Sequence, residues 1–136
     1  MILKAGTILI NKDKKAIGLV KRKKHNDISF PKGHVEENES LLDCAIRETI
    51  EETGRKCRVI KNEPIYIDQY NNKEGLVKVY YYLVEDLGEI NKKIDEELLW
   101  VNIDKVNDYL TYDVLKEMYT KIYDTILSDM WYTNFK

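Results

Sequence analysis

Seven residues between positions 33 and 54 combine glycine, glutamate and arginine at spacings that could build a metal site. They follow the pattern Gly33-x5-Glu39-x7-Arg47-Glu48-x2-Glu51-Glu52-x-Gly54. On a helix, Glu48, Glu51 and Glu52 fall within an arc of about 100°. Carboxylate oxygens that converge on one patch suit a hard divalent cation, Mg²⁺ above all. The alternative is a solvated acidic surface, which is common for glutamate-rich helix faces.

The segment over residues 40–53 is predicted to be the helix that presents these glutamates. Ser40 is a favourable N-cap, and Gly54 stands where a left-handed residue often ends a helix. The glutamates repel one another at i,i+3 and i,i+4 spacings, and near the helix C-terminus the dipole also disfavours negative charge. Because folding alone would not favour this arrangement, it indicates a functional requirement. The face expected to meet the core consists of Leu42, Ile46, Thr49, Ile50 and Thr53.

The complete pattern is the signature of the Nudix hydrolases, and the chain resembles that family. Seven fixed positions match by chance about once in 10⁸ starting points, at a background of about one in fifteen per residue type. The segment over residues 100–104 also resembles the family, so we expect a single Nudix hydrolase domain over residues 1–136. Two positions depart from the family pattern, because Thr49 and Arg55 stand where aliphatic residues are usual.

The resemblance implies a fold and an activity. The fold would be of the α/β (α+β) class, an α-β-α sandwich with a central mixed β-sheet and a C-terminal packing helix. Nudix enzymes cleave a pyrophosphate bond in a nucleoside diphosphate linked to another group, through attack of a metal-activated water on phosphorus. The implied cofactor is Mg²⁺ or Mn²⁺, and the implied partner is a nucleotide substrate.

The resemblance also assigns expected roles to individual residues. Arg47 would orient the glutamates by charge-assisted hydrogen bonds, and Glu39 would fix Arg47 and the start of the helix. The resemblance does not decide whether the general base comes from the helix or from a later loop. The expected metal ligands are the carbonyl of Gly33 and the carboxylates of Glu48, Glu51 and Glu52. The candidates for the base are Glu51, Glu52, Asp95, Glu96 and Glu97, with Glu96 and Glu97 favoured within the loop.

Expectations about the substrate depend on a loop and a strand. Residues 29–36, with their Pro-Lys-Gly-His sequence, resemble the loop of dinucleoside polyphosphate hydrolases, in which Lys32 and His34 would contact phosphates. Strand alternation places Lys78, Tyr80 and Tyr82 on one face. There the lysine would hold polyphosphate, and a tyrosine could stack on adenine. The alternatives are a solvated lysine, a hydrogen-bonded loop histidine and tyrosines that only pack.

The expected substrates are dinucleoside polyphosphates such as diadenosine tetraphosphate, which would yield two mononucleotides. Within the enzyme class, the alternatives are a nucleoside triphosphate pyrophosphohydrolase and an enzyme that removes pyrophosphate from RNA 5′ ends. Outside that class, the alternative is a non-catalytic module that senses nucleotides. Such modules often lose box carboxylates, whereas all three are present in this chain.

Composition limits the remaining possibilities. The chain has 136 residues, 43% hydrophobic and 34% charged, which is typical of one folded domain. Its net charge of −2 argues against binding along duplex nucleic acid, which usually requires a basic excess. No apolar run approaches the roughly 20 residues of a transmembrane helix, and the N-terminus lacks the layout of a signal peptide. Cys44 and Cys57, expected as reduced thiols, agree with a cytoplasmic location.

Strands and helices alternate along the rest of the chain. A hairpin is predicted from strands over residues 4–10 and 16–20, followed by an irregular segment over residues 21–33. Further strands are expected over residues 57–60, 65–69, 76–84 and 98–101. A stripe at spacings of three and four predicts a C-terminal packing helix, with Leu115, Met118, Tyr119, Ile122, Ile126 and Met130. The terminal aromatic residues either fold back onto the domain or form a homodimer contact, and they are Trp131, Tyr132 and Phe135.

Overall fold

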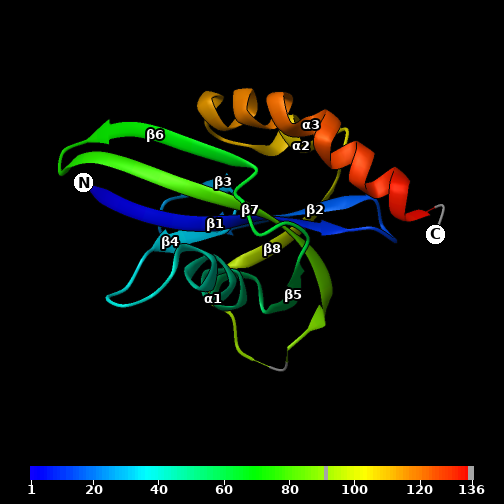
Figure 1. Cartoon of the computed structure of the whole chain (residues 1–136), viewed down its shortest axis with the longest axis horizontal. Helices are drawn as coiled ribbons and strands as arrows, with labels where there is room; N and C mark the ends of the chain where they lie inside the picture. The colour runs from blue at the N-terminus through cyan, green and yellow to red at the C-terminus, as the bar shows by residue number, and fades with distance from the viewer. Residues whose placement is uncertain (91, 135–136) are drawn as a thin grey trace.

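The computed structural model describes residues 1–90 and 92–134, with side chains described up to residue 130. Its helices and strands form three layers (Figure 1). None of the helices in these ranges is long and apolar enough to cross a membrane. The prediction for Trp131, Tyr132 and Phe135 concerns side chains that lie outside the described part.

The middle layer is a mixed sheet with eight strands among the described residues. The first strand and the seventh lie side by side and are parallel, whereas the other pairs are antiparallel. The order is β3-β2-β1-β7-β5, with β4 also paired to β1, β6 to β7 and β8 to β2. The strands are β1 (Ile2–Asn11), β2 (Ala16–Arg22), β3 (Asp27–Ser29), β4 (Lys32–His34), β5 (Arg55–Val59), β6 (Tyr66–Asn72), β7 (Gly75–Glu89) and β8 (Glu97–Asn102).

Helices cover both faces of this sheet. Figure 1 shows α1 (Leu41–Thr53) below the sheet, and α2 (Val106–Tyr109) and α3 (Asp113–Asn134) above it. Each face has its own buried cluster. Ile8, Ile10 and Tyr81 pack with residues of α3, whereas Leu9 and Tyr82 pack with Cys44 and Ala45 of α1. Because successive side chains of a strand point to opposite faces, the apolar runs of β1 and β7 contribute to both clusters.

The structure confirms the expected fold class and most of the expected elements. The antiparallel hairpin of β1 and β2 forms as predicted, as do the later strands and the C-terminal helix. The prediction of an irregular segment over residues 21–33 is wrong, because it contains the end of β2, all of β3 and the first two residues of β4. The short strand β4 pairs with Lys4, Ala5 and Gly6 of β1. Its β conformation therefore comes from a distant partner rather than from local propensity.

Candidate active site

Helix α1 begins and ends where local signals predict. The Ser40 hydroxyl accepts a hydrogen bond from the Asp43 amide at 3.0 Å, and Gly54 ends the helix with a φ of 68°. The buried face differs in part from the expected one. Leu42, Ile46 and Ile50 are only partly buried, and the fully buried residues are Cys44, Ala45, Thr49 and Thr53. Small residues face the sheet because the helix lies close to β1, where the Thr49 and Thr7 hydroxyls are 2.6 Å apart.

Gly33 lets one of the helix carboxylates lie directly against strand β4. A Cβ atom at this position would collide with the carboxylate of Glu48. Glu48 is partly buried there, and burial raises the pKa of its carboxyl group, with the nearby charge of Glu51 adding to the effect. The glycine of the sequence pattern is therefore required by the close approach of backbone and side chain.

Arg47 ties the acidic residues of this region together. Its Nε donates to Glu39 Oε2 at 2.7 Å and its Nη2 donates to Glu39 Oε1 at 3.0 Å, a bidentate contact. Its Nη1 donates to Glu48 Oε1 at 2.7 Å and to Glu51 Oε2 at 3.2 Å. The hydrogen bonds from Arg47 lower the pKa of Glu39 to about 2. Arg47 also donates to the carbonyl of His34 at 3.0 Å, which links α1 to β4.

Glu52 is bound differently from the other two glutamates. Its Oε1 accepts a hydrogen bond from the backbone N–H of Lys32 at 2.8 Å. Burial raises the pKa of Glu52 to about 7, against the opposing effects of the Lys32 amide and ammonium. Burial beside strand β4 therefore makes the negative charge of this carboxyl group costly unless a cation compensates it.

The donor set suits a hard cation, although its side chains are now engaged with protein groups. Within residues 1–90 and 92–134, no three His, Cys, Asp or Glu side chains converge as a ready-made metal site. Glu48 and Glu51 contact Arg47, and Glu52 contacts Lys32. The groups are nevertheless all oxygen ligands on successive turns of one helix, beside the backbone of Gly33. Such a set fits Mg²⁺ or Mn²⁺, which would take the place of the hydrogen bonds from Arg47 and Lys32.

The acidic residues of the later loop contact other parts of the chain rather than helix α1. Glu96 accepts a hydrogen bond from the backbone N–H of Lys23 at 3.0 Å, and Glu97 begins β8 opposite Lys21. Asp95 is exposed. In the described part of the chain, no hydrogen bond or ion pair joins any of the three to α1. Their assignment as a general base stays a prediction.

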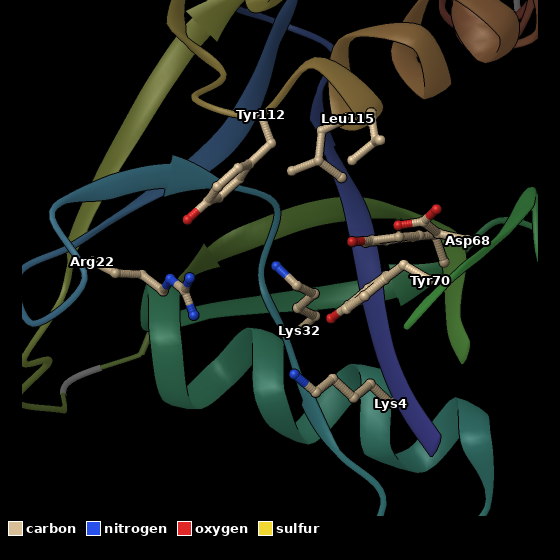
Figure 2. Close-up of a pocket in the computed structure, with 9 residues that line it drawn as sticks. Lys4, Arg22, Lys32, Asp68, Tyr70, Tyr112 and Leu115 are labelled. Carbon is tan, nitrogen blue, oxygen red and sulfur yellow. The ribbon is translucent and has the colours of Figure 1, made fainter. Parts of the chain in front are cut away.

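A basic cavity of about 370 Å³ opens beside Glu52, on the α3 side of the sheet. Three cations enter it from three strands, and Figure 2 shows the ends of Lys4, Arg22 and Lys32 turned toward one space. Lys32 joins the cavity to the helix, because its backbone binds Glu52 while its ammonium group lines the cavity. Enclosure and the Arg22 charge lower the pKa of Lys32 to about 8. The lining residues are Lys4, Arg22, Lys32, Asp68, Tyr70, Tyr81, Tyr112, Val114 and Leu115.

The residues expected to bind substrate do not all lie at the cavity. Lys32 lines the cavity, but the His34 side chain is exposed and lies outside it. Tyr80 and Tyr82 lie on the α1 face of β7, opposite the cavity, and strand alternation puts Lys78 on the same face. The expectation that Tyr82 contacts substrate is corrected, because Tyr82 packs against α1 on the face opposite the cavity and is not among the residues that line it. Tyr80 packs against the same cluster.

Sequence reasoning missed every lining residue of the cavity except Lys32 as a site residue, and among those missed Lys4, Arg22, Tyr81 and Tyr112 come from separate strands and a loop. Lys4 had the clearest signal, since it is a charged residue in a strand that is otherwise mainly apolar. Tyr81 is directed into the cavity by the alternation that turns Tyr82 away. Nothing local to Arg22 or Tyr112 indicates that they meet, because 90 positions separate them in the chain.

Comparisons with known proteins show what the chain is similar to. The sequence model of the NUDIX domain matches residues 2–122. "Nudix hydrolase 13, mitochondrial" from Arabidopsis thaliana is 27% identical over 101 residues, which cover 65% of this chain and 50% of that protein. The mRNA decapping complex subunit 2 of Schizosaccharomyces pombe is 41% identical over 64 residues, which cover 46% of this chain and 9% of that protein.

A solved structure shares the fold over nearly the whole chain. The binary complex of a C. elegans Ap4A hydrolase matches with a TM-score of 0.79 and 19% sequence identity, covering 94% of this chain and 99% of that one. The chain spans about half the length of the Arabidopsis relative and a much smaller part of the decapping subunit.

Proposed function

The chain belongs to the Nudix hydrolase family, and we propose that it is a metal-dependent pyrophosphohydrolase acting on nucleoside diphosphates linked to another group. The observation that carries this proposal is the position of Lys32. Its backbone N–H binds Glu52 and its side chain enters the basic cavity. Groups that suit a cation therefore lie beside groups that suit phosphates, which is the pairing that phosphoanhydride hydrolysis requires.

The metal would be held by carboxylates of α1 and by the backbone beside them. Mg²⁺ or Mn²⁺ held there would supply an activated water and neutralise charge on the leaving phosphate. Arg47 keeps the carboxylates oriented through its contacts with Glu39. Glu52 is the proposed base, because the Lys32 amide engages only its Oε1 and leaves its other oxygen to take a proton. The proposed ligands are Glu48, Glu51, Glu52 and the carbonyl of Gly33.

Among substrates, we propose dinucleoside polyphosphates such as diadenosine tetraphosphate. Three cations in one cavity suit a chain of phosphates. The rings of Tyr70 and Tyr112 lie at the cavity and offer surfaces on which a base can stack. The second candidate is an RNA 5′ end, favoured by the 41% identity with a decapping subunit over 64 residues. A single domain over residues 1–136, a cytoplasmic location and a homodimer remain parts of the proposal.

A panel of substrates tests this proposal. Purified protein with Mg²⁺ is incubated separately with diadenosine tetraphosphate, the common nucleoside triphosphates, ADP-ribose and 5′-triphosphorylated RNA. We expect the highest kcat/KM for diadenosine tetraphosphate. Preference for a nucleoside triphosphate or for RNA would replace the substrate class and keep the reaction. No hydrolysis of any of them would contradict the proposed activity and favour a module that only binds nucleotides.

Replacing Arg47 with lysine is expected to lower kcat by about 10–100-fold, the usual effect of removing a group that orients metal ligands. Lysine keeps the positive charge but cannot hold Glu39 with a bidentate fork while it also contacts Glu48. The measurement is kcat at saturating substrate and metal. The control is Arg58→Lys, because Arg58 is a mostly exposed arginine paired with Glu85 away from α1. An Arg47→Lys enzyme with unchanged kcat would remove Arg47 from the mechanism.

Tyr81→Phe is expected to raise KM roughly fivefold, the effect of losing one hydrogen bond of about 1 kcal/mol. The Tyr81 hydroxyl is buried in the cavity wall, and within the described residues it has no hydrogen-bond partner. A substrate oxygen would supply that partner. The melting temperature should not fall, since phenylalanine removes an unsatisfied group.

Tyr119→Phe is the matched control for this change. The Tyr119 hydroxyl is buried in the same core cluster, but it already donates to the carbonyl of Ile103 at 2.7 Å. This variant should lose stability and keep the normal KM. If Tyr81→Phe lowered the melting temperature as Tyr119→Phe does and left KM unchanged, Tyr81 would have only a packing role.

A further inference from the structure

Asp27 is a buried carboxylate that holds two residues of the cavity wall. It is 2% exposed and accepts hydrogen bonds from Arg22 Nε at 2.7 Å and Arg22 Nη2 at 2.5 Å. Its Oδ2 also accepts a hydrogen bond from the Tyr112 hydroxyl at 2.7 Å. The hydrogen bonds from Arg22 are the main reason that the pKa of Asp27 falls to about 2. The contact with Arg22 therefore favours the ionised form of the carboxylate.

This cluster connects three segments that are distant in sequence. Arg22 ends β2, Asp27 begins β3, and Tyr112 directly precedes α3. The segment before α3 is pinned further, because Thr111 accepts a hydrogen bond from the Ile28 amide at 2.8 Å and donates its own amide to the Ile28 carbonyl at 3.1 Å. A frame of hydrogen bonds from these three segments therefore holds the Arg22 guanidinium in place.

The frame directs Arg22 toward the cavity and leaves some of its N–H groups available to an acceptor there. The contact with Asp27 uses Nε and Nη2, so Nη1 remains for another acceptor. Figure 2 shows this guanidinium facing the ends of Lys4 and Lys32. Burial and the charge of Arg22 both lower the pKa of Lys4, and the same causes act on Lys32. The three cations are thus crowded, and an anion between them relieves their repulsion.

We propose that Asp27 is a positioning residue for substrate binding, which holds Arg22 so that its free edge binds a phosphate group of the substrate together with Lys4 and Lys32. This inference builds on the proposed function and adds to it the residue that organises the phosphate site. It also explains why an acid lies buried beside a site for anions. Its negative charge by itself disfavours phosphate, whereas the orientation that it gives to Arg22 favours phosphate binding.

Charge and orientation predict opposite effects of Asp27→Asn on anion binding, so the direction of the measured change distinguishes them. Asp27→Asn removes a negative charge beside the cavity, so an effect of charge alone would strengthen anion binding. Loss of orientation weakens it, because an amide cannot accept from Arg22 and Tyr112 as the carboxylate does. Arg22→Lys is the second variant. It keeps the cavity charge but removes the bidentate fork.

The chain offers a matched control at the other end of β1. Asp86 is also nearly buried and accepts from Arg55 Nε at 2.8 Å, from Arg55 Nη2 at 2.7 Å and from Asn11 Nδ2 at 3.0 Å. Asn11 is the last residue of β1, whereas Lys4 lies near its start. Seven residues of strand separate the two sites by about 23 Å. Asp86→Asn therefore disrupts the same kind of cluster without touching the cavity.

The experiment measures binding of inorganic triphosphate by calorimetry at low salt without divalent metal. We expect Asp27→Asn and Arg22→Lys to bind at least about tenfold more weakly than wild type, the effect of one charge-assisted hydrogen bond. Asp86→Asn should bind like wild type, although both aspartate variants lose several degrees of melting temperature. Assays with diadenosine tetraphosphate and Mg²⁺ should show a higher KM and a nearly unchanged kcat for Asp27→Asn.

Several results would overturn the inference. One is that Asp27→Asn binds triphosphate as tightly as wild type or more tightly. Another is that Asp86→Asn weakens binding as much as Asp27→Asn does. The third is that the wild-type protein does not bind triphosphate. The metal-free measurement also separates this inference from the proposed function. If no nucleotide is hydrolysed but Asp27→Asn still weakens triphosphate binding, the activity is wrong and the phosphate site remains supported.

Discussion

Replacing Glu52 with glutamine should lower kcat by about 10²–10⁴-fold, the range for loss of a group that transfers a proton in the transition state. Glutamine keeps an oxygen that can accept from the Lys32 amide, but it cannot take a proton from water or offer a charged ligand to a cation. KM should change much less, because the cations of the cavity stay in place. The measurement is single-turnover and steady-state hydrolysis at saturating Mg²⁺.

The same substitution should leave the melting temperature unchanged or raise it. Glu52 is a partly buried carboxyl group whose pKa is raised to about 7, so its charged form is disfavoured in the folded protein. A neutral side chain of the same shape removes that cost and the repulsion from Glu48. Activity lost only because of unfolding would instead appear as a lower melting temperature.

Glu117→Gln is the control for Glu52→Gln. Glu117 is an exposed glutamate of α3, so its replacement makes the same chemical change without reaching the helix α1 carboxylates. We expect normal kcat and a normal melting temperature for this variant. A Glu52→Gln protein that retained activity while its melting temperature fell sharply would show that Glu52 has a structural role only.

Removing divalent metal should abolish hydrolysis, and restoring it should stabilise the fold. Chelation of the purified protein with EDTA is expected to bring turnover to the background rate, and Mg²⁺ or Mn²⁺ should restore it. A ligand at 100 times its Kd adds about 2.7 kcal/mol to the free energy of unfolding. The melting temperature should therefore rise by several degrees as metal is added without substrate.

The melting experiment locates the metal independently of activity. Glu48→Gln combined with Glu52→Gln should abolish the rise in melting temperature caused by metal, because two of the proposed oxygen ligands lose their charge. Glu117→Gln should show the full rise. A rise that persists in the double variant would place the metal elsewhere. Full activity after EDTA treatment would contradict metal-dependent catalysis.

The features that sequence predicted well depend on residues close together in the chain. Ser40, Arg47 and Gly54 act within one helix, where a spacing of three or four residues sets which side chains meet. The N-cap, the C-terminal glycine and the grouping of glutamates on one face therefore follow from local geometry. The hairpin of β1 and β2 was predictable for the same reason, since a short turn joins its strands.

The phosphate cavity was not predictable in this way. Lys4, Arg22 and Lys32 belong to three strands, and Tyr112 reaches Asp27 across 85 positions of the chain. Which residues meet depends on the pairing of β4 with β1 and of β6 with β7. A shift of one residue in strand register would exchange the faces and turn Tyr82 into the cavity in place of Tyr81.

The amino-acid sequence by itself determined the family resemblance and the acidic helix. It did so because periodic spacing along one helix is a property of the local chain. Only the tertiary structure decided which lysine and which tyrosine face the cavity, and that Asp27 holds Arg22. Those contacts depend on strand register and on helix packing across the sheet, which are decided by the burial of the whole core rather than by any short segment.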